Sequence, residues 1–218
     1  MSNFTEITES IKAKIIERDY LICVLSGGFD SFVLTYLVFK LAAEFNPGCK
    51  IELWTIPRPN RSEEHSVAIS GWLKETFPSI NSEFKLLGNK ELIEKIHHTQ
   101  QVGFGIQIGL KQLRKLGLNN CVLFLGDTKN PDVQLDNPHT VYRKRIDTAQ
   151  ISFIMQPFFD IDKSAVVLLA QELNVLEEAS IMTHSCSGVL RGRCKKCWQC
   201  CERAWAFASL SLTDVGDN

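Results

Sequence analysis

Apolar and polar residues alternate in blocks along the chain, and the blocks predict strands and helices in turn. Short runs rich in apolar and β-branched residues predict buried strands at residues 21–25, 50–55, 82–86, 121–125 and 151–155. Longer segments with apolar residues at helical spacing predict helices at residues 8–18, 32–43, 62–76, 91–97, 106–116, 162–173 and 197–210. Strands that alternate with helices are typical of an α/β fold, in which helices cover both faces of a parallel sheet.

Composition and charge fit one such domain with a small appendage. The chain has 218 residues, of which 44% are hydrophobic and 22% charged, and its net charge is −1. A balance this close to zero gives no general attraction to nucleic acid or to a membrane. Apolar runs stay below the roughly 18 residues that cross a bilayer, and the first residues lack a signal-peptide pattern, so we expect a cytoplasmic protein. We expect residues 1–180 to form a nucleotide-binding α/β domain and residues 181–218 a metal-binding segment packed on it.

The junction between the first strand and the helix after it is the first candidate site. Residues 25–31 have the sequence Leu-Ser-Gly-Gly-Phe-Asp-Ser. Gly27 and Gly28 have no Cβ atom, so backbone N–H groups can surround an anion there. The start of a helix adds unsatisfied N–H groups and a partial positive charge, which favour phosphate. The alternative is an ordinary strand–turn–helix in which Asp30 and Ser31 cap the helix.

Two other loops should lie beside this junction, because ligands of parallel sheets bind at the carboxyl ends of the strands. The loop at residues 56–62 contains Arg58 and Arg61, which can bind phosphate or can be solvated surface charges. The loop at residues 126–145 is longer than a plain connection, and such loops are often functional, although a surface excursion is the alternative. Its candidate residues are Asp127, Thr128, Lys129, Asp132, Asp136, His139, Arg143, Lys144 and Arg145.

Cysteines at metal-ligand spacing form the second candidate site. The sequence has 8 cysteines, and without export a cluster of them indicates a metal site rather than disulfides. The clustered cysteines are Cys186, Cys194, Cys197 and Cys200. Four thiolates fill the tetrahedral shell of Zn²⁺, so we expect a structural zinc site. Cys201 is an alternative ligand that breaks the spacing, a reduced cluster without metal is another alternative, and Cys23 and Cys121 fit the core.

The Ser-Gly-Gly-x-Asp-Ser string at residues 26–31 resembles the pyrophosphate loop of the ATP-pyrophosphatase (PP-loop) superfamily. Enzymes of that superfamily cleave ATP to AMP and pyrophosphate. The resemblance implies that Asp30 binds Mg²⁺ or orders the loop. The other residues implied to hold the nucleotide are Leu25, Ser26, Gly27, Gly28, Phe29, Ser31, Arg61 and Gly126.

The tail resembles 7-cyano-7-deazaguanine synthase (QueC), a family within that superfamily. The resemblance rests on Thr-His-Ser-Cys at residues 183–186 and on Arg-Cys-Lys-Lys-Cys-Trp-Gln-Cys-Cys-Glu-Arg at residues 193–203. The stretch that ends in Lys163 is also similar to that family, which implies that this lysine meets ATP phosphates; an exposed lysine in a first helical turn is the alternative. Together the two resemblances cover residues 20–45 and 151–207.

The middle of the chain departs from the QueC pattern. Where that family has an Asp-x-Gly-Gln-Arg-like stretch, residues 56–61 match it only at Arg61, and a Pro-x-Arg-Asn-like segment is absent. Gly126 and Asp132 approximate, but do not reproduce, the spacing expected after the fourth strand. Because these loops would contact the nucleobase or the substrate, the sequence predicts the ATP half of the reaction more firmly than the acceptor.

The resemblance implies an ATP-dependent carbon–nitrogen ligase of queuosine biosynthesis, with Asp30 and Lys163 as its catalytic residues. A 7-carboxy-7-deazaguanine-like carboxylate would attack the α-phosphate of ATP, ammonia would convert the acyl-adenylate to an amide, and a second adenylation would give a nitrile. The implied cofactors are ATP, Mg²⁺ and Zn²⁺. The implied partners are the deazaguanine carboxylate and ammonia, and a second copy of the chain is a candidate partner.

Two other functions stay open at this point. One is a PP-loop enzyme that adenylates a tRNA or a protein, in which basic residues of the tail contact an RNA backbone; a solvated basic rim is the alternative for these residues. They are Arg191, Arg193, Lys195, Lys196 and Arg203. The other function is nucleotide binding without turnover, on the same fold. Asp30 together with the complete Ser-Gly-Gly string favours an enzyme.

Overall fold

The computed structural model of the chain describes residues 3–57, 62–88, 91, 101–115, 120–135, 153–187 and 192–217. Its centre is a five-stranded sheet of order β3-β2-β1-β4-β5, and every neighbouring pair is parallel. The strands are β1 (Tyr20–Val24), β2 (Lys50–Thr55), β3 (Asn81–Leu86), β4 (Cys121–Phe124) and β5 (Ile154–Met155). The predicted parallel α/β fold is therefore confirmed, because each predicted strand overlaps a strand of this sheet.

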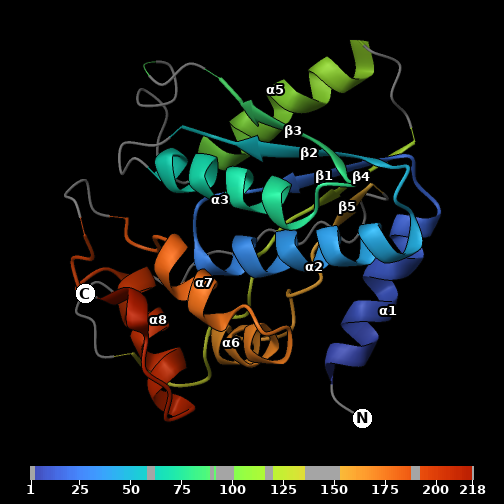
Figure 1. Cartoon of the computed structure of the whole chain (residues 1–218). Helices are drawn as coiled ribbons and strands as arrows, with labels where there is room; N and C mark the ends of the chain where they lie inside the picture. The colour runs from blue at the N-terminus through green and yellow to red at the C-terminus, as the bar shows by residue number, and fades with distance from the viewer. Residues whose placement is uncertain are drawn as a thin grey trace.

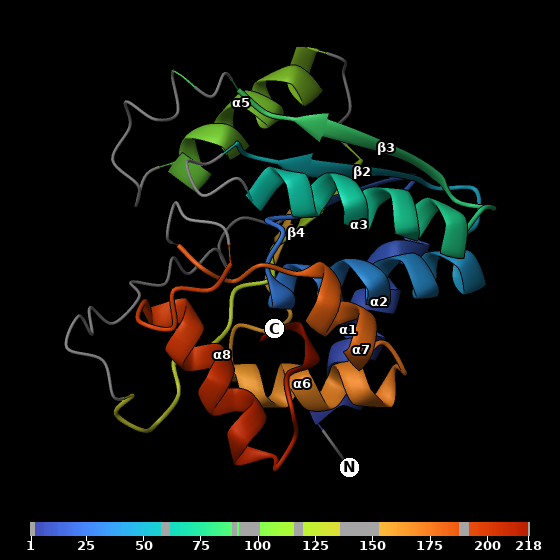
Figure 2. The ribbon, with the colours of Figure 1, turned by 60° about the vertical axis from the view of Figure 1, so that its left-hand side comes forward.

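Helices cover both faces of the sheet (Figure 1). The helices are α1 (Asn3–Ile16), α2 (Phe29–Phe45), α3 (Ser62–Thr76), α5 (Gln101–Lys115), α6 (Lys163–Glu172), α7 (Leu176–Met182) and α8 (Trp198–Ser209), followed by the 3-10 turn η1 (Val215–Asp217). Helix α5 lies on one face, and α2 and α3 lie on the other, with α6, α7 and α8 on the outer side of α2 (Figures 1 and 2). None of the helices in these ranges combines the length and the apolar character that crossing a membrane requires.

The central helix α2 is buried nearly all round. The sheet covers one side of it, and α1, α6 and α7 pack against its other sides. An all-round apolar surface is what such a position requires, and the sequence supplies it from Phe29 to Ala42. The first turn of α2, which follows the glycine pair directly, is thereby fixed in the core.

Four features differ from the sequence-based expectations or lie beyond them. Helix α2 begins at Phe29 rather than Phe32, because Gly28 already serves as its N-cap. Helix α7 was not predicted, since seven residues are too few to show a helical period. The predicted helix at residues 91–97 lies outside the described residues except for its first position. The expected division after residue 180 falls inside α7, and the two-part organisation stays a prediction.

The α5 side of the sheet buries a polar network around Glu52, whose side chain is 1% exposed. The Tyr20 hydroxyl and the Lys85 ammonium both donate to Oε1 of Glu52, and Trp54 Nε1 donates to its Oε2 at 2.7 Å. Helix α5 lies tightly on this network, because a Cβ atom at Gly109 would come within 2.3 Å of the Trp54 ring. Both carboxylate oxygens of Glu52 are thus hydrogen-bonded under a closely packed helix.

Candidate functional site

The glycine turn after β1 lies where several strand ends meet. Gly27 has φ +77°, and a Cβ atom there would lie 2.3 Å from the carbonyl oxygen of Ser62. A Cβ atom at Gly126, just after β4, would lie 3.1 Å from the backbone of Asp30. The turn at residues 26–31 therefore touches the ends of both predicted neighbouring loops; only glycine fits at position 27, and the contact at position 126 is tight. Arg58 and Arg61, as well as residues 136–145, lie outside the described residues.

Hydrogen bonds between two serines hold this turn in shape. Ser26 Oγ lies 2.9 Å from Ser31 Oγ, which accepts a hydrogen bond from the Ser26 N–H and donates one to the Gly28 carbonyl. Gly28 is the N-cap of α2, and this cap residue makes no side-chain hydrogen bond to the helix. The alternative in which Asp30 and Ser31 cap the helix is wrong, because both residues lie in its first turn. A helix start without a side-chain cap offers its N–H groups to an anion.

Leu25 and Phe29, predicted to contact the nucleotide, have completely buried side chains. The Leu25 carbonyl accepts hydrogen bonds from the hydroxyls of Thr55 and Ser66 at 2.6 and 3.0 Å. The Phe29 ring packs edge-on against Phe207. These two positions can therefore offer a ligand only backbone atoms.

Asp30, Lys163 and Glu202 form a buried charge cluster beside the turn. Lys163 is the first residue of α6, which Asp162 caps by accepting a hydrogen bond from the Ala165 N–H. Its Nζ lies 2.5 Å from Asp30 Oδ2 and 3.4 Å from Glu202 Oε2. Lys163 is 3% exposed, so the alternative of an exposed lysine is wrong. Asp30 Oδ1 is buried and finds no hydrogen-bond partner among the described residues. Glu202 is a member of this cluster that the sequence-based analysis missed.

The tail of the protein contacts the same turn. The His184 N–H donates to the Gly27 carbonyl at 2.8 Å, and the Phe29 N–H donates to Ser185 Oγ at 3.5 Å. The His184 ring stacks on His65 of α3 with 5.1 Å between the ring centroids. Burial, together with His65, lowers the pKa of His184, so this imidazole is neutral at neutral pH. The turn after β1, helix α3 and the tail segment that contains His184 and Ser185 are far apart in the sequence, but they meet at one place in the fold.

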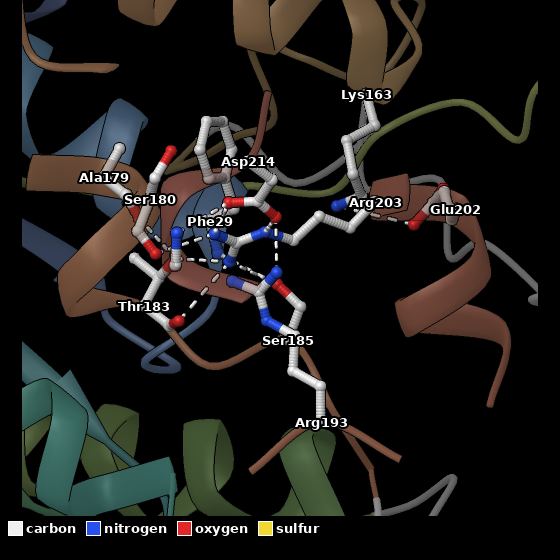
Figure 3. Close-up of polar contacts among 11 residues, drawn as sticks. Phe29, Lys163, Ala179, Ser180, Thr183, Ser185, Arg193, Glu202, Arg203 and Asp214 are labelled. Atoms are coloured by element: carbon white, nitrogen blue, oxygen red, sulfur yellow. Dashed lines mark hydrogen bonds and ion pairs between the residues drawn. The ribbon is translucent and has the colours of Figure 1, made fainter. Parts of the chain in front are cut away.

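Arg203 of α8 links the tail to the first turn of α2 (Figure 3). Its guanidinium lies 5.1 Å from the Phe29 ring centroid and donates to Thr183 Oγ1 at 2.7 Å. Both oxygens of Asp214 accept from it, at 2.7 and 2.9 Å, and Arg193 binds the same carboxylate. Burial acts to raise the pKa of Asp214, but the hydrogen bonds from Arg203 hold it below its ordinary value. Burial lowers the pKa of Arg203, while Asp214 acts in the opposite direction.

Arg193 and Arg203 are therefore internal ion-pair residues and not part of an exposed basic rim. Arg203 is 1% exposed, and the side chain of Arg193 is 8% exposed. The sequence carried one signal for the burial of Arg203, since Ala206 and Phe207 follow it at helical spacing and lie on the same side of α8. Asp214 follows α8 in an otherwise polar segment, so nothing in the pattern pointed to it.

The four predicted cysteines come together next to this network. Their sulfur atoms lie within 4.8 Å of one another; the Cys194–Cys200 and Cys186–Cys197 pairs are 3.9 and 4.0 Å apart. A tetrahedron with metal–sulfur bonds of about 2.3 Å has sulfur atoms about 3.8 Å apart, so the cluster fits a single ion such as Zn²⁺. The hydrogen bond from Cys200 lowers the pKa of the Cys197 thiol to about 3, and a thiolate is the form that binds metal.

The remaining cysteines take the places predicted for them. The Cys201 thiol faces the carbonyl of Lys195 and is not a member of the four-sulfur group, so the structure does not support the alternative in which Cys201 is a ligand. Cys23 and Cys121 are buried in strands β1 and β4. Burial raises the pKa of both thiols, which makes them inert core residues.

Comparison with known proteins places this site in a family context. Residues 128–211 match the family model described as Queuosine biosynthesis protein QueC. This part of the chain is similar to QueC. The match confirms the predicted resemblance over the segment that carries Lys163, Glu202 and the four cysteines, and it supports an ATP-using enzyme of the PP-loop kind. The turn at residues 26–31 lies before the matched segment.

Two further comparisons give little additional information about the function of this protein. No curated protein matches the chain. Among solved structures, the chain is similar to the U34-tRNA thiolase NcsA from Methanococcus maripaludis with its [4Fe-4S] cluster. The sequence identity is 14%, the alignment covers 96% of this chain and 73% of that chain, and the TM-score is 0.49.

Proposed function

We propose that this protein is an ATP-dependent, AMP- and pyrophosphate-forming ligase of the 7-cyano-7-deazaguanine synthase type. The observation that carries the proposal is the meeting of the glycine turn with Lys163. The turn offers backbone N–H groups at a helix start, and Lys163 comes from the QueC-like segment to within 2.5 Å of Asp30. Two parts of the chain that separately resemble ATP-handling motifs thus form one site.

The turn and the cluster divide the binding of MgATP between them. The backbone of Gly27, Gly28 and the first turn of α2 suits the β- and γ-phosphates, because the helix begins there and its first N–H groups carry partial positive charge. The free oxygen of Asp30 is a hard, buried ligand of the kind that Mg²⁺ takes. When bound, Mg²⁺ would neutralise charge on the departing pyrophosphate.

The proposed reaction consumes two molecules of ATP. The substrate carboxylate attacks the α-phosphorus, the bond to the β-phosphate oxygen breaks, and pyrophosphate leaves with that electron pair. Ammonia adds to the acyl-adenylate, which loses AMP and a proton to give the amide. The amide oxygen attacks a second α-phosphorus, pyrophosphate leaves again, and loss of AMP and a proton gives the nitrile.

The protein's part in these steps is electrostatic. Lys163 places a buried positive charge beside the turn, and a preorganised charge in a low-dielectric site stabilises negative charge as it develops on the leaving group. The serine pair fixes the turn before ATP arrives, so little reorganisation is needed during the reaction. No covalent protein nucleophile enters the scheme.

The four-cysteine cluster has a structural role in this proposal. Four thiolates leave no open coordination position, so the metal holds the tail in place and takes no part in adenylation. We propose Zn²⁺ as the ion, since a tetrahedral set of sulfur ligands suits zinc or iron and the sulfur atoms are close enough for a single ion.

The test is AMP and pyrophosphate release by the purified protein with MgATP, ammonium and 7-carboxy-7-deazaguanine. We expect one AMP and one pyrophosphate for each amide and two of each for each nitrile, with no AMP when the carboxylate is omitted. Lys163→Ala should abolish release, whereas Lys85→Ala, which removes a lysine paired with Glu52, should retain it. Release only with tRNA or with a protein acceptor would overturn the small-molecule acceptor, and ATP binding without any turnover would overturn the enzyme.

A further inference from the structure

Lys163 has two carboxylate partners, and only one of them lies on the glycine turn. Asp30 belongs to the first turn of α2, whereas Glu202 belongs to α8 in the tail. The side chains of Lys163, Asp30 and Glu202 are 4%, 11% and 2% exposed. A cation this deeply buried stays in place only where carboxylates hold it. Figure 3 shows Glu202 reaching the lysine from the side of α8.

The two carboxylates would not be equivalent once a nucleotide is bound. If Asp30 turns toward Mg²⁺, its hydrogen bond to Lys163 weakens, while the ion pair between the ammonium and Glu202 is kept. Glu202 cannot follow Asp30, because it belongs to a different helix and lies two residues after the metal-ligating Cys200. Its carboxylate therefore remains a fixed counter-charge behind the lysine.

We propose that Glu202 is a positioning residue, which holds the Lys163 ammonium at the phosphate-binding turn while Asp30 changes partner. The proposal rests on the proposed function and deepens it, because it assigns a role to a tail residue. Arg203, the next residue, contacts Phe29 of the turn, so consecutive positions of α8 support the site from behind. The thiolate cluster thereby fixes the place of the lysine through α8.

The experiment compares wild type with Glu202→Gln and uses Glu52→Gln as the matched control. Glu52 is also a buried glutamate with a lysine partner, Lys85, but it lies in the polar network beneath α5. The ATP dissociation constant is measured by calorimetry. The reactivity of Lys163 toward an amine-specific reagent is measured by mass spectrometry, with and without ATP.

We expect Glu202→Gln to weaken ATP binding about tenfold, because the counter-charge 3.4 Å from the Lys163 ammonium is lost. Lys163 should react faster in this variant, and ATP should protect it less. Metal content should be unchanged, and kcat should fall by a smaller factor than KM rises, which a general loss of folded protein would not produce. Glu52→Gln should lower stability without changing either Lys163 reactivity or ATP affinity.

Each outcome decides the proposal. Wild-type ATP affinity and wild-type Lys163 reactivity in Glu202→Gln overturn it. If Glu202→Gln does not fold, Glu202→Asp, which keeps the charge on a shorter side chain, should show the same effects at smaller size, and wild-type values for it also overturn the role. If the wild-type protein binds no ATP, the proposed function fails, and the positioning role is decided by Lys163 reactivity alone.

Discussion

Two buried carboxylates of this protein, Glu52 and Asp30, each pair with a lysine but differ in their second oxygen. In Glu52, one oxygen accepts from Tyr20 and Lys85, and the other accepts from Trp54. In Asp30, one oxygen binds Lys163, and the other finds no partner among the described residues. Buried polar atoms are nearly always hydrogen-bonded, so an exception needs an explanation.

This difference is the one we expect between a structural carboxylate and the proposed ligand-binding one. The satisfied Glu52 network lies in the sheet beneath α5, where Gly109 lets the helix close over it. The unsatisfied oxygen of Asp30 lies at the carboxyl ends of the strands, where parallel sheets bind their ligands. Position and incomplete hydrogen bonding together point to the Asp30 side as the functional one.

The largest expected effect is that of removing the metal. Structural zinc sites contribute on the order of 10 kcal/mol to folding, so chelation or Cys197→Ser should release α8 and the segment that contacts Gly27. Hydrogen exchange should then rise in residues 183–187 and in α8, while β1 and β2 around Glu52 stay protected. Metal analysis and exchange mass spectrometry check this. Cys201→Ser, the matched control, should keep its metal, and a metal-free wild type of equal stability would contradict a structural site.

The next effect concerns the Asp30 side alone. Asp30→Asn keeps the shape of the side chain but removes the charge that pairs with Lys163. We expect AMP and pyrophosphate formation to fall about 10³-fold, or roughly 4 kcal/mol, with a melting temperature near that of wild type because Glu202 still holds the lysine. Asp160→Asn, an exposed carboxylate near α6, serves as control. Unchanged turnover in Asp30→Asn would sink the assignment of the turn.

The Glu52 side should show the reverse behaviour. Glu52 is buried and accepts three hydrogen bonds, so weakening them in Glu52→Gln should cost about 3 kcal/mol and lower the melting temperature by roughly 6–12 °C. ATP affinity should not change, because the hydrogen bonds of Glu52 come from Tyr20, Lys85 and Trp54 and not from residues of the glycine turn. Thermal unfolding and calorimetry with ATP measure the two quantities. If Glu52→Gln lowered ATP affinity without lowering stability, Glu52 would not be the structural carboxylate of the two.

The sequence predicted most of the sheet because each strand is an apolar run between clear turn signals. It also predicted the glycine turn and the four cysteines, since both depend on residue type and close spacing rather than on distant contacts. The cap of α6 by Asp162 was likewise predictable, because N-capping is a local interaction.

The remaining parts of the site depend on contacts that no local pattern contains. Glu202 meets Lys163 across 39 positions of the chain, and Asp214 meets Arg203 across a helix end. A charged residue in an amphipathic helix is usually a solvated one, so the pattern gave no reason to bury Glu202. The start of α2 at Phe29 also depended on tertiary packing, because the buried first turn extends the helix back to the glycines.

The smallest expected effect is on how the free energy of unfolding depends on pH in the acid range. This effect comes from the Glu52 network. Burial acts to raise the pKa of Glu52, but hydrogen bonds from Lys85, Tyr20 and Trp54 hold it below its ordinary value of 4.5. The folded state therefore binds fewer protons than the unfolded state just below pH 4.5. The stabilisation is complete above that pH and is lost as the pH falls through the folded pKa. Each unit of difference is worth about 1.4 kcal/mol.

Glu52→Gln should remove this part of the acid dependence, so the free energies of unfolding of variant and wild type should converge as the pH falls. Urea unfolding between about pH 7 and about pH 3.5 measures the convergence. Asp214, whose pKa is also held below its ordinary value, stays in both proteins and sets the slope that remains. Parallel curves would mean that the hydrogen bonds to Glu52 do not hold it ionised, and the contrast with Asp30 would then lose its electrostatic basis.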